Sequence, residues 1–507
     1  MKQKMSFIFL CVIFAASLAG VSDVQAEYAY LDGDLVFHGK ISEQLLMRTT
    51  GKQRYDVYDY DIFNFRTTFK LETKWDAIKD SKYNLTFYSV FKDFYDAAAD
   101  VDSGYRNYLQ WGSNGSNHGI DEVKSYETFT DICRELYAEV TNPWWQLRVG
   151  KQIVSWGEAS FERMADVVNP LDARGDLNPV LIDFDEAKRG LWMARFTLTP
   201  PDFWQDMFFE FLVIPDFEPT RNWPAGYHLT HPPSMNQTKN PNELFLPDYR
   251  TARDIGYHDP AMGFRIRGLT FGFDWTVFYL YHRSYNSVIK EGKGVASQLP
   301  VLFGRGRVSD DVKMFGHQTS TGFTFNRPVN KQITIIPGIR SLNMSGNIWR
   351  LEFLAELGKE NDRGYTPNVV EKDRYAFVMG WDTYIQIPWL STWNRNRKLS
   401  SSTQLFMEWV PGKHRDDYIY PWVTYGPTRK HAATITESLS YDFWNSRILP
   451  AIYLSHAIDD GRSFYAPTLA FKPTFHWTYL VRYINYIDYG TSTQNLDYVL
   501  FDVTYEF

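Results

Sequence analysis

The chain has 507 residues and a formal net charge of −7, and 17% of its residues are aromatic. The acidic balance argues against a nucleic acid as a partner. No segment beyond the N-terminus approaches the run of about eighteen apolar residues that a membrane-spanning helix needs. Outside the N-terminal apolar run Cys133 is the only cysteine, which excludes an internal disulfide, a thiolate metal cluster and a CxxCH haem site.

The N-terminus has the pattern of a secretory signal peptide. Two lysines precede the short apolar run Phe7–Ala19, and Val24–Ala26 supplies a small-residue cleavage site. The apolar run is too short to cross a bilayer. We therefore expect residues 1–26 to be removed and residues 27–507 to form one mature domain in the bacterial envelope.

The mature chain has the pattern of a succession of amphipathic β-strands. In residues 63–75, for example, Phe65 and Phe69 alternate with Arg66 and Lys70, so one face is apolar and the other is charged. About eighteen such segments follow one another, each of roughly ten to fourteen residues, as tilted membrane strands require. In chain order they lie near residues 35–48, 63–75, 83–94, 132–141, 145–156, 191–199, 207–216, 262–270, 271–283, 314–326, 348–359, 375–388, 400–410, 432–443, 447–458, 462–472, 475–487 and 496–507. The predicted fold class is all-β, a transmembrane antiparallel β-barrel of about eighteen strands with long outer loops.

The lengths of the connections support a barrel. Outer-membrane barrels alternate short periplasmic turns with longer outer loops. Here Asn142–Pro143 and Gly272 mark short turns, whereas Tyr95–Asp131 and Phe217–Ala261 are long. Residues 327–347 break the alternation because they are long for a periplasmic turn. Their core, residues 333–339, could form another strand or an inward-folded segment, which leaves a sixteen-strand barrel as the alternative count.

The chain ends on a strand with one apolar face. In Leu496–Phe507, the side chains of Val499, Phe501 and Phe507 share a face opposite Asp502. This strand resembles the C-terminal recognition strand of bacterial outer-membrane barrels, which the barrel assembly machinery reads. The alternative is the last strand of a soluble sandwich. The resemblance implies insertion into outer-membrane lipid through a strand that ends at Phe507.

The most distinctive internal stretch is Leu147–Ala194. It contains Arg-Val-Gly-Lys-Gln at residues 148–152, Trp-Gly-Glu at 156–158 and Asn-Pro-Leu-Asp at 169–172. This stretch resembles the signature of the outer-membrane family numbered thirteen-oh-two among the domains of unknown function, and more distantly that of the alginate-export porins. The resemblance implies an envelope transport barrel, often associated with lipid-export machinery of the resistance-nodulation-division type. The proline-rich continuation of many members is replaced here by Asp183–Arg189.

The strand at the start of this stretch predicts a polar lumen face. Leu147, Val149 and Ile153 fit the lipid face. A charge on that face near the midplane would cost about 2–4 kcal/mol, so the lumen face is assigned Arg148, Gln152 and Glu158. Lys151 falls at the opposite parity, where it is predicted to snorkel or to mark a bulge.

The long segment Gly157–Gly190 is predicted to fold inward from the outer rim and to narrow the pore. Its candidate constriction residues, which carry both signs of charge, are Glu158, Asp172, Arg174 and Arg189. Its apolar side chains would anchor it to the inner wall, since an exposed apolar loop costs stability; they are Phe161, Val167, Val168 and Leu171. The alternative is that the charged residues only brace a long loop against the barrel wall.

Strand parity supplies further pore-lining candidates. They are Arg195, Arg265, Arg267, Arg350 and Glu352, with Glu210, Glu356, Gln404, Glu408 and Arg482 at similar positions. Opposed acids and bases in a pore set a transverse field that orients polar solutes. The alternative is that these groups only neutralise one another in a hydrated interior.

Catalysis is not expected. Ser113 and His118 occur close together, but their Gly- and Asn-rich surroundings predict a loop with no strand to hold the two side chains together. The acids Asp183 and Asp185 have no fixed separation. No Ca-loop, P-loop or HExxH pattern is present, so the sequence predicts neither a metal nor a cofactor.

The sequence therefore predicts a porin or transport barrel of the outer membrane that passes a small polar or amphiphilic solute. Two alternatives stay open. One is a lipid or polymer export barrel that works with a periplasmic or inner-membrane pump, and the other is a scaffold barrel for an envelope complex. The expected partners are outer-membrane lipid, the barrel assembly machinery and, in the export version, the pump.

Overall fold

The structure is a computed structural model. It describes residues 28–49, 62–80, 82–112, 124–126, 128–159, 163–172, 184–200, 207–221, 259–285, 288–290, 312–314, 316–329, 333–334, 343–358, 360–362, 369–385, 387, 398–411, 431–459, 461–487 and 496–507. The predicted signal peptide, residues 1–26, lies outside the described residues.

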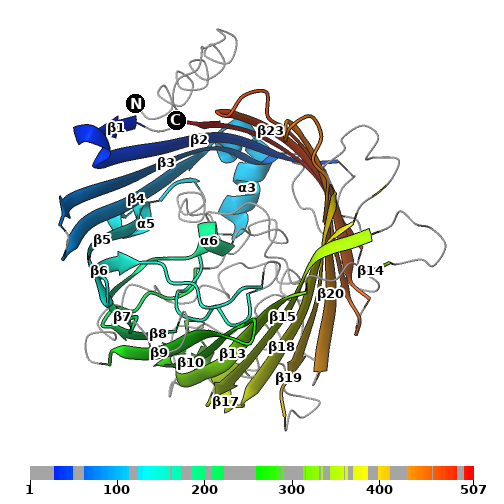
Figure 1. Cartoon of the computed structure of the whole chain (residues 1–507). Helices are drawn as coiled ribbons and strands as arrows, with labels where there is room; N and C mark the ends of the chain where they lie inside the picture. Colours follow the sequence, from blue (N-terminus) through cyan, green and yellow to red (C-terminus); the bar gives the residue numbers. More distant parts are fainter. Residues whose placement is uncertain are drawn as a thin grey trace.

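Among the described residues, eighteen antiparallel strands form a closed barrel (Figure 1). They are β2 (Leu35–Arg48), β3 (Ile62–Lys79), β4 (Asn84–Asp96), β5 (Cys133–Asn142), β6 (Trp145–Gln152), β7 (Leu191–Leu198), β8 (Phe208–Ile214), β9 (Ala261–Thr270), β10 (Phe273–Arg283), β13 (His317–Val329), β15 (Asn343–Leu357), β18 (Arg374–Ile385), β19 (Leu399–Trp409), β20 (His431–Ser440), β21 (Ile448–Ala457), β22 (Ser463–Phe471), β23 (Trp477–Ile487) and β24 (Leu496–Glu506). The shorter elements are β1 (Tyr28–Tyr30), η1 (Leu31–Gly33), α2 (Ala98–Val101), α3 (Ser103–Gly112), α5 (Phe129–Ile132), α6 (Phe184–Ala187), β11 (Val288–Lys290), β12 (Val312–Met314), β14 (Ile333–Thr334), β16 (Glu360–Asp362) and β17 (Val369–Glu371).

The barrel closes where the first long strand meets the last. β2 pairs with β24 from Lys40↔Glu506 to Arg48↔Tyr498. Two backbone hydrogen bonds extend this seam, since the Gly39 amide donates to Phe507 O at 2.7 Å and the Phe507 amide donates to Gly39 O at 2.8 Å. The predicted eighteen-strand closure of residues 35–48 against 496–507 is confirmed.

Side chains alternate between an apolar outer face and an inner face. On β24, Phe501 is 44% exposed to the outside, whereas its neighbour Leu500 is buried inside. Aromatic pairs gather near both rims, as they do in barrels that span a membrane. At the end with the short connections Trp477 lies 4.8 Å from Tyr505, and at the other end Tyr375 lies 5.5 Å from Trp409 between ring centroids.

The long connection between β13 and β15 does not add a barrel strand. Both strands extend beyond their predicted bounds and pair directly, and β14 adds only two pairs with β15, Ile333↔Met344 and Thr334↔Asn343. The sixteen-strand alternative is therefore not correct, and of the further strand suggested for residues 333–339 only the two residues of β14 are described. Residues 335–339 lie outside the described residues.

β6 is shorter than predicted. It ends at Gln152 rather than at residue 156. Ile153, predicted on the lipid face of this strand, therefore lies beyond it, where its amide donates to Glu135 Oε1 at 2.8 Å. From this point the chain leaves the barrel wall.

Candidate functional site

The connection from β6 to β7 enters the barrel and packs against its inner wall (Figure 1). Its described parts next to β6, residues 153–159 and 163–172, are here called the inner segment. Val154, Trp156 and Val168 of this segment belong to a buried cluster with side chains from six strands of the wall. The wall members are Leu191, Met193, Leu212, Ile214, Phe278, Leu280, Leu354, Ala376, Val378 and Phe406. The inner segment thus shields from water an apolar patch that a hydrated lumen would otherwise expose.

Two of the predicted apolar anchors take part in this packing, since Val168 belongs to the cluster and Val167 packs against it. Leu171 is buried as well but lies outside the cluster. Phe161 lies outside the described residues.

Glu352 on β15 holds the inner segment by its backbone. Its carboxylate accepts from the Glu158 amide at 2.5 Å and from the Ala165 amide at 3.3 Å. Next to it, Arg350 donates to Glu158 O at 3.1 Å and pairs with Asp382 at 2.5 Å. The Glu158 side chain accepts from Asn326 on β13. Charge-assisted bonds of this kind are stronger than neutral ones, so they fix the segment firmly.

Glu210 on β8 is a second anchor. It is fully buried, and it accepts from Trp156 Nε1 at 2.7 Å, from Arg195 at 2.6 Å and from Arg265 at 3.1 Å. Arg265 also donates to Ser155 O at 3.3 Å. A buried charge is tolerated when it has such partners, so Glu210 joins the inner segment to two wall arginines.

Replacing Glu352 by Gln is expected to loosen the inner segment while the barrel stays folded. The amide has the same size but loses the charge and one acceptor, which removes about 1–3 kcal/mol of hydrogen bonding to the segment. Single-channel recordings should show a larger or noisier current. The matched control is Glu72→Gln, because Glu72 accepts from the wall residue Tyr88 instead. Equal currents in the two variants would contradict this role for Glu352.

Internal bonds stiffen the inner segment. Asn169 Oδ1 accepts from the Val154 amide at 2.8 Å, and its Nδ2 donates to Gln152 O and Arg189 O. Asp166 pairs with Lys188 at 2.5 Å and accepts from the Trp156 amide at 3.2 Å. The segment is therefore a folded unit rather than an open loop.

The end of the same connection, at α6, is bound to a different part of the wall. Glu186 pairs with Lys70 on β3 at 2.7 Å and with Lys92 on β4 at 2.8 Å, and Arg134 on β5 donates to Glu186 O at 2.7 Å. Burial opposes ionisation of Glu186, but the charges of Lys92 and Lys70 outweigh it and hold the pKa of Glu186 well below its usual range.

The lysines that bind α6 belong to a row on the inner face. Lys40 pairs in register with Lys70, and Lys70 pairs with Lys92. Three lysines are thus direct cross-strand neighbours on β2, β3 and β4, a repulsive arrangement that a carboxylate relieves. Glu186 supplies that carboxylate for two of them.

Arg189 and Asp172 lie in a layer of joined outer connections. The guanidinium of Arg189 is 5% exposed and bonds Asp131 at 2.9 Å, Glu218 at 3.0 Å and Pro219 O at 3.0 Å. Asp131 also pairs with Arg221 at 2.9 Å. The Asp172 amide donates to Ala187 O at 2.7 Å. Both residues are buried. The prediction that they face the pore is therefore not met, and both residues bond the outer connections to one another instead.

The other predicted site residues lie on the wall. Arg148 pairs with Glu139 at 2.5 Å, and Arg267 pairs with Asp274. Gln152 is 0% exposed and donates to Met193 O at 3.0 Å. The prediction that it lines the pore is therefore wrong, because the inner segment covers it. Arg174 lies outside the described residues.

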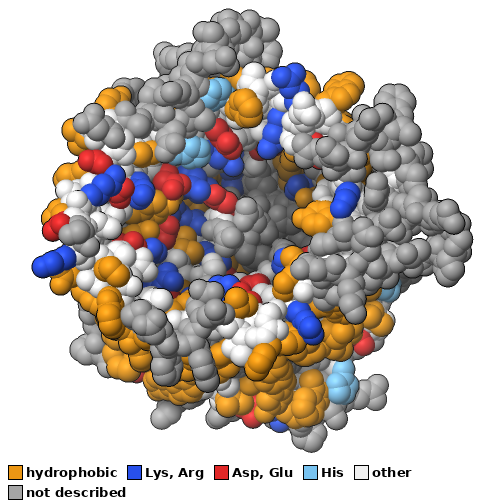
Figure 2. All heavy atoms as spheres, in the orientation of Figure 1, with side chains coloured by type: hydrophobic (Ala, Val, Ile, Leu, Met, Phe, Trp, Pro, Cys, Tyr) orange, Lys and Arg blue, Asp and Glu red, His pale blue; other side chains and the backbone are white. Residues whose placement is uncertain are grey.

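A second inward fold narrows the lumen on another side. α2 and α3 contribute Ala98, Ala99 and Tyr105 to a buried cluster with Leu46 of β2 and with residues of β3 and β22–β24. Figure 1 shows α3 within the ring of strands. A hollow remains at the centre of the face in Figure 2, with charged side chains along its wall.

Several residues that attach the connection from β6 to β7 to the wall were missed in the sequence. Lys70 and Lys92 were readable as inward-facing by parity, but their role depends on the register between strands. Glu186 and Asp166 lie in segments without periodicity, where no sequence signal marks them.

Among the described residues, no helix is both long and apolar enough to cross a membrane. In the same part of the chain, no group of three or more His, Cys, Asp or Glu side chains could hold a metal ion. Of the residues considered for catalysis, Ser113, His118 and Asp183 lie outside the described residues.

A closed barrel with an apolar outer face, aromatic belts and a charged interior is a transmembrane β-barrel of the outer-membrane type. The model of the family described as "Protein of unknown function (DUF1302)" matches residues 32–507. The chain belongs to this family. Among curated proteins none matches the sequence.

The solved structures with similar folds are outer-membrane proteins. OpdK of Pseudomonas aeruginosa, crystallised with vanillate, is 8% identical with a TM-score of 0.48, over 94% of this chain and 98% of that one. OccAB2 of Acinetobacter baumannii is 11% identical with a TM-score of 0.48 over the same shares. OccK9 (OpdG) of Pseudomonas aeruginosa is 8% identical with a TM-score of 0.49, over 94% and 99%. At such low similarity no functional residue is carried over from them.

Proposed function

We propose that this chain is an outer-membrane channel for a small polar solute, with a constriction formed by the inner segment and residues 184–190. One observation carries the proposal: a single connection is bound to opposite walls of the barrel. Its inner segment bonds Glu352 on β15, and its α6 end bonds Lys70 on β3. In the order of barrel strands, β15 is the ninth strand after β3, which is half of eighteen.

The charges around this connection favour a polar solute. The wall at β2–β4 carries the row of Lys40, Lys70 and Lys92, and Glu186 supplies one carboxylate for two of these three lysines. A solute that passes this row experiences a field from one side of the pore, which orients dipolar and zwitterionic molecules. The wall residues Arg195 and Arg265 are neutralised by Glu210, so we assign them to holding the segment rather than to contact with solute.

The purified barrel in planar bilayers should give discrete, small single-channel currents. Lys40→Gln should shift the reversal potential in a salt gradient toward cation preference, because it removes a positive charge from the inner row. Lys79→Gln is the matched control, since Lys79 lies at the exposed end of β3 and pairs with Asp34. A channel that stays closed under all conditions would overturn the proposal and favour an export barrel that a pump opens.

A further inference from the structure

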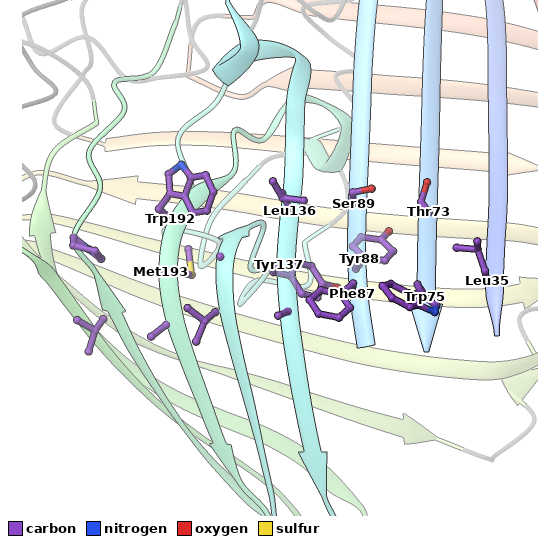
Figure 3. Close-up of a pocket in the computed structure, with 16 residues that line it drawn as sticks. Leu35, Thr73, Trp75, Phe87, Tyr88, Ser89, Leu136, Tyr137, Trp192 and Met193 are labelled. Carbon is purple, nitrogen blue, oxygen red and sulfur yellow. The ribbon is translucent and has the colours of Figure 1, made fainter. Parts of the chain in front are cut away.

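A groove of about 680 Å³ opens in the lipid-facing surface of the barrel over β2–β8 (Figure 3). A row of side chains, each in register with the next across neighbouring strands, runs along it. In order from β2 the row is Leu35, Trp75, Phe87, Ala138, Val149, Ala194 and Val213. This groove lies outside the lumen and takes no part in the constriction.

The row faces the membrane. Val149 is 51% exposed, and Trp75 and Val213 are also exposed, whereas Met193 on the inward parity is buried. Leu136 and Trp192 belong to the next outward-facing row and form one edge of the groove. The lining is therefore turned toward hydrocarbon rather than toward water.

Small residues make the groove deep. Ala138 and Ala194 on β5 and β7 flank Val149, and Gly150 next to it has no side chain. The φ of Gly150 is +138°, and an added Cβ would come within 2.3 Å of Leu136 O. The backbone of β6 therefore lies close against β5 only because residue 150 is glycine. At one end, Trp75 stacks on Phe87 with 5.4 Å between ring centroids and forms a wall.

The surface of the groove is uncharged. Lys151 has the outward parity between Leu136 and Trp192, yet it is 3% exposed and its Nζ donates to Thr130 O at 2.5 Å. The ammonium is withdrawn toward α5 and does not reach the bilayer core. Lys151 was predicted to snorkel to the interface or to mark a bulge. It does neither, because its ammonium bonds an internal carbonyl and not water.

We propose that the groove is a binding site for one acyl chain of a membrane lipid. Seven strands line it, and six steps of about 4.8 Å give a length of roughly 29 Å, which exceeds the roughly 15 Å of hydrocarbon in one leaflet. A second copy of the barrel would present a convex wall that cannot fill a concave surface. A flexible chain can follow it and gain dispersion contacts that an unfilled groove would lack.

The test is photolabelling in proteoliposomes with phosphatidylethanolamine that carries a diazirine in one acyl chain, followed by peptide mass spectrometry. Labelling of β5–β7 is expected to exceed that of the lipid-facing residues of β20 at least several-fold. The double variant Ala138→Trp, Ala194→Trp fills the groove and should reduce this excess to the level of β20. The matched control is Ala433→Trp, on the outer face of β20 next to the exposed Ile435, and it should leave the excess unchanged.

Heat-modifiable gel migration checks that each variant is folded, and single-channel currents check that its lumen is unchanged. Uniform labelling around the barrel, or an excess that survives in the filled variant, would overturn the site. Protection of the groove together with a dimer in native electrophoresis would instead identify a second copy as the occupant and would also overturn it.

Discussion

Replacing residues 153–190 by a tight Asn-Gly turn is expected to raise the single-channel conductance several-fold and to weaken ion selectivity. The design is feasible because Gln152 and Leu191 are register partners on β6 and β7, so a short hairpin turn can join them without a change in strand register. The change removes both the inner segment and α6. Glu352 and the lysine row would then face open water, where their charges act across a wider and better screened lumen.

Planar-bilayer conductance and reversal potentials measure the effect. The deletion exposes the apolar wall patch at Leu212 and Phe406 and so could destabilise the barrel. Heat-modifiable gel migration therefore verifies that the variant is still folded. Glu352→Gln should give a value between wild type and the deletion, because it loosens the segment without removing it. If the deletion conducts like wild type, the constriction lies elsewhere in the barrel.

Deleting Phe507 should sharply reduce the amount of assembled barrel while export to the periplasm continues. The residue closes the seam with two backbone hydrogen bonds to Gly39. Its ring lies over that glycine so closely that an added Cβ would be 2.1 Å from the ring. It also stacks on Tyr505, with 6.1 Å between the centroids. Loss of these contacts opens the end of the seam and removes the terminal aromatic of the proposed recognition strand.

The assay compares heat-modifiable protein in the outer-membrane fraction with protein in the periplasm. Gly39→Leu should reproduce the defect from the other strand, because its side chain displaces the ring. Phe501→Leu is the matched control, since it changes an aromatic on the lipid face of the same strand but leaves the seam intact. Normal levels of folded barrel without Phe507 would contradict the proposal.

The wall of the barrel could be predicted because each strand repeats one physical constraint. A strand between lipid and water must alternate, and β3 does so over most of its length, with Phe69 outward and Lys70 inward. The seam could be predicted for the same reason. The strand ends could not, because β13 and β15 continue past their predicted ends as a ladder that the alternation does not mark.

The path of the inner segment could not be predicted in full. The strand was predicted to run to residue 156, but Val154 and Trp156 share the parity of the polar Arg148 and Gln152. Their side chains pack inside the barrel. An apolar residue against the inner wall gives the same sequence signal as one against lipid. Only the partners on the opposite wall, such as Leu354, distinguish the two.

The roles of the charged pore-lining candidates depend on partners that are distant in the sequence. Arg189 reaches Asp131 and Glu218, which belong to two other connections. Nothing local in the sequence indicates such a meeting, so Arg189 was placed in the pore. The alternative of a bracing role describes Arg189 and Asp172 better, and Glu352 likewise binds the backbone of the inner segment at Glu158 and Ala165.

The two attachments of the connection differ in how they respond to salt. Glu210 and Glu352 are at most 1% exposed, so dissolved ions barely weaken their bonds. Lys70 and Glu186 are 28% and 30% exposed, and at 1 M salt the screening length falls to about 3 Å. Concentrated electrolyte is therefore expected to weaken the attachment at α6 before the attachment at Glu210 and Glu352. The diameter of the pore thus depends partly on the ionic strength of the solution inside it.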